Sequence, residues 1–90
     1  MRLEYDGTKR AETLLHREVD FARASDVFAG VTFTREDERN DYGEVRMVTV
    51  GLLDERMVVI VWTQRGEARR IISMRKANDR EQARYRSRLG

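Results

Sequence analysis

The sequence contains no cysteine and no proline, and it has a single histidine, His16. Without cysteine the chain can form neither a disulfide nor a cysteine-based zinc site. Its carboxylates are concentrated in the segment 35–44, which lacks the spacing of a calcium-binding loop. We therefore expect no metal site and no cofactor, and we expect stability to come from packing, helped by a partner.

Long hydrophobic runs are also missing. No apolar stretch approaches the roughly 20 residues of a membrane span. The first ten residues lack the apolar core of a signal peptide. With 90 residues, the chain is expected to form one domain over residues 1–90 with a thin core. These absences predict a cytoplasmic protein without a membrane partner.

Lysine is scarce, since Lys9 and Lys76 stand against sixteen arginines. Residues 1–64 carry nine basic and thirteen acidic side chains, a balance of −4, whereas residues 65–90 carry nine basic and three acidic ones, a balance of +6. GC-rich codon usage would explain arginine in place of lysine, but it does not explain this segregation. Because guanidinium groups bind phosphate through paired hydrogen bonds, the basic C-terminal part favours a phosphate-bearing partner.

Two short helices are predicted within the first thirty residues. The first begins near Asp6 or Thr8, either of which can cap it, and its apolar positions are spaced three and four apart: Ala11, Leu14 and Leu15. The second follows Asp20 as its N-cap and ends at Gly30. Both helices are too short to be stable without a sheet to pack on.

Four strands are predicted next, over residues 31–35, 44–53, 56–63 and 68–76, with a polar loop from Glu36 to Gly43. Strand 56–63 is apolar on both faces, which places it at the centre of the sheet. A last helix, Asp79 to Leu89, follows a capping box formed by Asn78 and Glu81. The pattern predicts an α+β fold with a four-stranded antiparallel sheet, two N-terminal helices and one C-terminal helix, all on one face. The uncovered face would then need a partner, a dimer mate or a substrate.

The junction between the last strand and the last helix concentrates positive charge. Four cations fall within eight residues: Arg69, Arg70, Arg75 and Lys76. Arg65 lies on the turn before them, and Trp62 precedes this turn, where it could stack on a base. We expect Arg46 to join Arg70, Arg75 and Lys76 in one cationic patch. Such a patch favours RNA as the ligand; the alternative is a charged strand edge that prevents aggregation.

Three segments make the sequence similar to a known family. "GEVRMVTVG", "VWTQRG" and "RRIISMRKANDREQARY" resemble the BrnT family of bacterial type II toxins, which are ribonucleases with a RelE-like fold. The resemblance runs from about Tyr5 to Tyr85. Its N-terminal matches are Tyr5, Asp6, Lys9, Phe21, Ala24, Val27 and Phe28, followed by Gly43, Glu44 and Arg46. Its most specific matches are Arg70, Ile71, Ile72, Ser73, Arg75, Ala77, Glu81 and Tyr85.

The resemblance implies a metal-independent endoribonuclease that uses the 2′-OH of its own RNA substrate as the nucleophile. This chemistry needs a base, an acid and positive charge around the phosphate. The residues implied in catalysis are Arg46, Arg70, Arg75, Lys76, Glu44 and Glu81, with Glu44, Glu81 and Lys76 as alternatives for the base. The residues implied in RNA binding are Lys9, Trp62, Arg65, Arg69 and Tyr85.

The resemblance also implies partners. These are a cognate antitoxin of the BrnA type, RNA, and operator DNA reached only through the antitoxin, while a homodimer within the complex stays open. One departure stands out, because His16-Arg17-Glu18 replaces the family's Lys-His-Gly. Glu18 thus stands where the family has a glycine that ends the helix. The alternative function is therefore a non-catalytic module that binds nucleic acid or protein.

Overall fold

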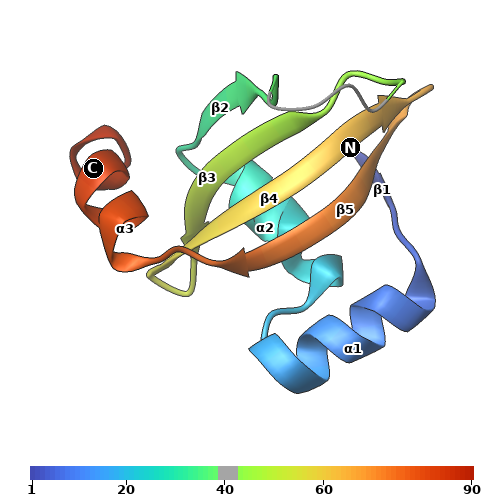
Figure 1. Ribbon diagram of the computed structural model, residues 1–90, viewed down its shortest axis with the longest axis horizontal. Coiled ribbons are helices and arrows are strands. Elements are labelled where there is room, and N and C mark those ends of the chain that lie inside the picture. The colour runs from blue at the N-terminus through green and yellow to red at the C-terminus, as the bar shows by residue number, and fades with distance from the viewer. Residues whose placement is uncertain (39–42) are drawn as a thin grey trace.

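The computed structural model describes residues 1–38 and 43–90, and Figure 1 shows how their helices and strands are arranged. The strands are β1 (Arg2–Glu4), β2 (Phe33–Glu36), β3 (Met47–Leu53), β4 (Arg56–Arg65) and β5 (Ala68–Lys76). The helices are α1 (Gly7–Arg17), α2 (Ala24–Ala29) and α3 (Asp79–Tyr85), with 3-10 turns η1 (Phe21–Arg23) and η2 (Arg86–Arg88). The predicted α+β class is confirmed, and half of the predicted loop 36–43, residues 39–42, lies outside the described residues. None of the described helices has the length and apolar character needed to cross a membrane.

The strands form one mixed sheet in the order β1-β5-β4-β3-β2. Strands β2 to β5 make the predicted antiparallel meander. β1 adds a fifth strand that runs parallel to β5, with Arg2 opposite Ala68. The prediction of a four-stranded antiparallel sheet is therefore wrong at this edge. A strand of three residues is too short to show an alternating pattern, and its partner follows sixty-six positions later (68 − 2).

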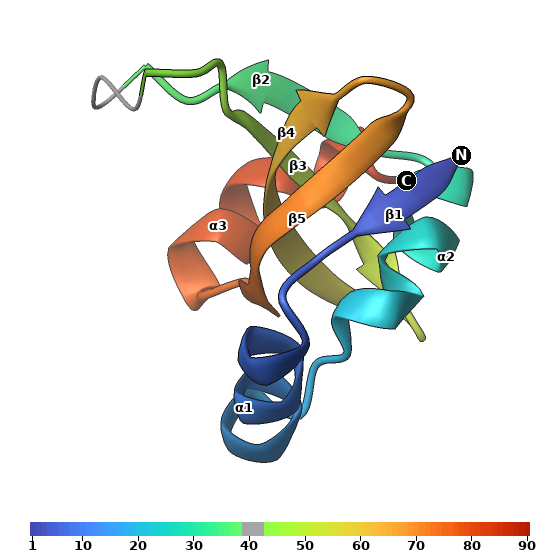
Figure 2. The ribbon, with the colours of Figure 1, turned by 90° about the vertical axis from the view of Figure 1, so that its right-hand side faces the viewer.

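One face of the sheet, which we call the N-terminal face, is covered by η1 and α2, while α1, which has no buried residue, lies below the sheet near β5 (Figure 2). Its core joins side chains of β4 and β5 to apolar residues that follow α1: Val58, Ile60, Trp62, Ile71, Met74, Val19, Phe21, Ala24 and Val27. Gly51 on β3 allows α2 to approach, because a Cβ atom there would lie 2.6 Å from Val27 Cγ1. Trp62 Nε1 donates a 2.8 Å hydrogen bond to Thr49 Oγ1, which satisfies a buried hydroxyl.

The opposite face, which we call the C-terminal face, is covered by α3 and η2. Tyr85 and Leu89 are buried there against alternate residues of the strands, which are Val48, Val50, Met57 and Val59. The Tyr85 ring lies 5.4 Å from the ring of Phe33. The prediction that all helices share one face is therefore wrong, and α3 supplies the cover that was expected from a partner. A few buried residues suffice for this, although most of the last helix is charged.

α1 begins and ends as its sequence predicts. Asp6 caps it by accepting hydrogen bonds from the N–H groups of Thr8 (2.8 Å) and Lys9 (3.0 Å). At the other end, Glu18 adopts φ 58° and ψ 31°, and its N–H donates to the carbonyl of Leu14. This left-handed conformation is the one in which glycine normally ends a helix, and any other residue raises its free energy.

We predict that Glu18→Gly increases the free energy of unfolding by about 0.5–1 kcal/mol, because glycine adopts the left-handed conformation without a steric cost. Urea denaturation would measure the change. Glu18→Ala is the control, since it removes the 3.5 Å contact with Lys76 Nζ but leaves the backbone cost in place. A glycine variant no more stable than the alanine variant would contradict this explanation.

Candidate functional site

A hollow of about 130 Å³ lies on the C-terminal face between β2, β5 and α3. Its floor consists of valines from the two central strands: Val48, Val50, Val59 and Val61. Its rim carries four guanidinium groups, which belong to Arg35, Arg75, Arg80 and Arg84. We call this site the arginine hollow.

The register of the sheet places these arginines together. Arg35 lies opposite Val48, and Arg75 lies opposite Val59. Residues that are directly opposite in antiparallel strands point to the same face, so both arginines stand over the valine floor. Arg80 and Arg84 are four residues apart on α3, which puts them on one side of the helix. The hollow therefore combines a strand from the first half of the chain with the last strand and the last helix.

Glu81 fixes one of the four arginines in the hollow. Its two carboxylate oxygens accept hydrogen bonds from Arg75 Nη1 (2.7 Å) and Nη2 (2.8 Å). It also completes the predicted capping box, because it accepts from the N–H of Asn78 and its own N–H donates to the Asn78 side chain. The hydrogen bonds from Arg75 lower the pKa of Glu81 to about 2, and they outweigh the opposing effect of partial burial. Glu81 is therefore an anion at neutral pH that holds Arg75 and α3 together.

The other three arginines of the hollow have no carboxylate partner within residues 1–38 and 43–90. Arg84 lies over the ring of Tyr85, with 5.6 Å between the guanidinium carbon and the ring centre. Four guanidinium groups against the carboxylate of Glu81 leave the hollow with a net charge of +3. The valine floor strengthens this field, because it keeps water from one side of the charges. A phosphodiester, which offers several acceptor oxygens and a negative charge, fits the hollow.

Other predicted site residues are held in contacts outside the hollow. Arg46 Nε donates to Glu44 Oε2 over 3.3 Å, and Arg65 Nη2 lies 3.7 Å from Glu44 Oε1. These three predicted residues form one ion cluster. Lys9 Nζ donates a 2.6 Å hydrogen bond to the carbonyl of Ile72, which attaches α1 to β5.

β5 separates the cations that were expected in one patch. Arg70 pairs with Glu4 on β1 at 3.1 Å, whereas Lys76 Nζ lies 3.5 Å from Glu18 at the end of α1. Six positions along a strand separate these two residues by roughly 20 Å. Because side chains alternate, Lys76 points to the N-terminal face and Arg75 to the opposite one. The prediction that Arg46, Arg70, Arg75 and Lys76 form one patch is therefore wrong.

Trp62, Arg69 and Tyr85 were predicted to bind RNA, but they belong to the packing. Trp62 is 7% exposed, which corrects the prediction that its ring could stack on a base. The guanidinium carbon of Arg69 lies 4.5 Å from the ring centres of both Trp62 and Phe28, so these two rings hold it. Tyr85 is buried and borders the arginine hollow as part of its wall.

Three hollow residues were not indicated by the sequence: Arg35, Arg80 and Arg84. Arg80 and Arg84 show a local signal, since their spacing of four puts two cations on one side of a helix. Arg35 shows none, because its place in the hollow depends on the pairing of β2 with β3. The described part of the chain contains no group of three or more His, Cys, Asp or Glu side chains that could hold a metal ion.

The sequence matches a known protein family. The family model described as "Ribonuclease toxin, BrnT, of type II toxin-antitoxin system" matches residues 5–81, which include Arg35, Arg75 and Glu81 of the arginine hollow. Among curated proteins, none matches the sequence. The family match covers most of the 90 residues. The chain therefore belongs to the BrnT family of ribonuclease toxins of type II toxin-antitoxin systems.

Proposed function

We propose that this chain is an endoribonuclease toxin that binds the scissile phosphate of RNA in the arginine hollow and cleaves the RNA without a metal ion. The observation that carries the proposal is the charge of the hollow, where Arg35, Arg80 and Arg84 surround the fixed guanidinium of Arg75. Membership in the BrnT family supports the ribonuclease class. The cationic rim supports the metal-free route, because guanidinium groups repel a metal ion and take over its role of stabilising negative charge.

In the proposed reaction, the 2′-oxygen of a ribose attacks the adjacent phosphorus and loses its proton. The bond between phosphorus and the 5′-oxygen breaks, and this oxygen gains a proton as it leaves. The products are a 2′,3′-cyclic phosphate and a 5′-hydroxyl end. Negative charge grows on the non-bridging oxygens in the transition state, and arginines aimed at those oxygens lower the barrier.

Glu81 acts in this proposal as a positioning residue. With a pKa of about 2 and both oxygens bound to Arg75, it is a poor acceptor for the 2′-OH proton at neutral pH. The other predicted candidates for the base, Glu44 and Lys76, do not line the hollow. The proposal therefore assigns charge stabilisation to the hollow and leaves proton transfer to water.

The proposed setting is the cytoplasm, with a cognate antitoxin of the BrnA type as the inhibitor. Binding to operator DNA through the antitoxin and a homodimer within the complex belong to the same proposal. A non-catalytic RNA-binding module is the second candidate. It is favoured by one observation, which is that Glu81, whose pKa is strongly lowered, is the only carboxylate among the described residues that line the arginine hollow.

We predict that Arg35→Ala lowers the rate of RNA cleavage about 100-fold, the usual cost of removing one charge stabiliser from a preorganised site. The measurement is cleavage of an RNA oligonucleotide in excess EDTA, together with a thermal melt of the variant. Arg35→Lys should recover only part of the rate, because lysine cannot make two parallel hydrogen bonds.

Arg2→Ala is the matched control, since it removes the same charge from β1 at the other edge of the sheet. Its cleavage rate should stay within about twofold of the wild-type rate. Cleavage that stops in EDTA, or an Arg35→Ala variant with an unchanged rate, would contradict the proposal. RNA that is bound but never cut would select the non-catalytic module.

The pH dependence of the free energy of unfolding should reveal the contribution of the Arg75–Glu81 pair. The folded pKa of Glu81, about 2, lies below the ordinary value of 4.5, so the pair stabilises the fold fully above about pH 4.5 and loses this effect as pH falls through 2. We predict that Glu81→Gln lowers the free energy of unfolding by roughly 1–3 kcal/mol at pH 7 and that this difference shrinks below pH 4.5. Glu67→Gln, on the exposed β4–β5 turn, is the control and should show no such trend. A difference for Glu81→Gln that stays constant down to pH 2 would argue against the pair.

A further inference from the structure

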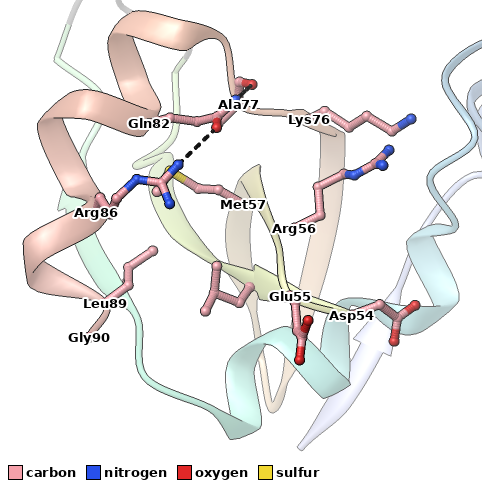
Figure 3. A pocket seen from close by; sticks show the side chains of 11 residues that line it. Asp54, Glu55, Arg56, Met57, Lys76, Ala77, Gln82, Arg86, Leu89 and Gly90 are labelled. Carbon is pink, nitrogen blue, oxygen red and sulfur yellow. Dashed lines mark hydrogen bonds between the residues drawn. The ribbon is translucent and has the colours of Figure 1, made fainter.

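A second and larger hollow, of about 590 Å³, lies on the other flank of α3 (Figure 3). It extends from the β3–β4 turn to the end of η2, and we call it the turn groove. Its lining includes four apolar side chains: Leu52, Met57, Ala77 and Leu89. Its rim includes three cations: Arg56, Lys76 and Arg86. Leu52 and Met57 lie on the C-terminal face, whereas Arg56 and Lys76 project toward the N-terminal face at the end of the sheet, where the groove meets an adjoining hollow.

Two of these cations are neighbours of like charge. Lys76 lies opposite Val58 on β4, and Arg56 is two positions before Val58, so both point to the same face of the sheet. Figure 3 shows their long side chains projecting in the same direction at one end of the groove. Arg56 and Lys76 are therefore diagonal neighbours of like charge on adjacent strands, and an anion placed between them would reduce their repulsion.

The described carboxylates leave this pair incompletely neutralised. Lys76 Nζ reaches Glu18 at 3.5 Å, but the Glu18 side chain is 81% exposed, so water screens the contact. Within residues 1–38 and 43–90, Arg56 forms no ion pair with a carboxylate. Asp54 on the neighbouring turn is already bound by Arg23 through both of its oxygens.

The exposed apolar side chains of the groove favour a peptide over RNA as its ligand. Leu52 is 43% exposed, and Leu14 is 43% exposed in the adjoining hollow that Arg56 and Lys76 also line. RNA phosphates would bind the cations but gain nothing from exposed leucines. A peptide that carries both carboxylates and apolar side chains and passes round the end of the sheet would neutralise the cations and cover the leucines together.

We propose that the turn groove binds an acidic, amphipathic segment of the antitoxin, which places a carboxylate between Arg56 and Lys76 and passes round the end of the sheet so that its apolar side chains contact Leu52 on the other face. The inference rests on the proposed function only in taking the antitoxin as the partner. α3 separates this groove from the arginine hollow, because Gln82 and Arg86 line the groove while Arg80 and Arg84 line the hollow. The antitoxin therefore holds the toxin at a site distinct from the one that binds the scissile phosphate.

The test uses the purified full chain and a cognate antitoxin of the BrnA type, with fluorescence anisotropy to measure their affinity. Arg56→Ala and Leu52→Thr should each weaken antitoxin binding at least about tenfold, and both should cleave RNA within about twofold of the wild-type rate. Arg2→Ala, which removes an equal charge far from the groove, should change neither quantity. Thermal melts of all variants exclude loss of the fold as the cause.

The possible outcomes distinguish a failure of the groove proposal from a failure of the proposed ribonuclease function. Unchanged antitoxin affinity in both groove variants would overturn the groove while leaving the ribonuclease intact. Arg56→Ala with weaker RNA binding and unchanged antitoxin binding would identify the groove as part of an RNA path and would also overturn the proposal. A wild-type chain that does not bind the antitoxin would reject the partner and the groove together, whereas RNA cleavage reports independently on the arginine hollow.

Discussion

The paired hydrogen bonds between Arg75 and Glu81 determine where the last helix lies, and both hollows of the molecule depend on that position. α3 has only seven residues, a length that is unstable alone in water. Three contributions hold it: the capping box at Asn78, the contact with Arg75 and the buried ring of Tyr85. One flank of the anchored helix completes the arginine hollow, and the other flank forms a wall of the turn groove.

The uneven distribution of charge along the chain has a structural role in addition to a binding role. Acidic residues of the first sixty-four positions pair with basic residues of the last twenty-six, as in Glu4 with Arg70, Glu18 with Lys76 and Glu44 with Arg65. Each such surface pair contributes little to stability. Together they direct the basic C-terminal part onto the acidic N-terminal part. The arginines of the hollow that remain after this pairing are the ones available to a ligand.

Local signals in the sequence were sufficient for most of the fold. Asp6, one of the two caps predicted for the first helix, and Asn78 cap their helices, while Asp20 caps the 3-10 turn η1 that precedes α2. Such caps can be predicted because each is a contact between near neighbours in the chain. The central position of β4 was also correctly predicted, since the apolar residues on both of its faces are visible within one segment. β1 could not be predicted, because three residues carry no pattern and the pairing with β5 spans nearly the whole chain.

The candidate site was predicted only in part, for the same reason. Arg75 and Glu81 are six positions apart and form part of a recognisable motif, so the sequence indicated them as candidates. Arg35 belongs to the hollow only because β2 pairs with β3 in one particular register. Trp62 was assigned to RNA because its chemistry suits base stacking, but the position of α2 over the sheet places it in the core.

The parallel pairing of β1 with β5 limits when parts of the fold can form during synthesis. The ribosome releases β1 first, yet β1 cannot pair until Ala68 to Arg70 have been synthesised. The arginine hollow likewise cannot form around Arg35 until β5 and α3 have been synthesised. Contacts between such distant positions slow folding, because the chain must close a long loop before any of them forms. A nascent chain therefore lacks the arginine hollow until synthesis has passed Arg84, the last of the four arginines that line it.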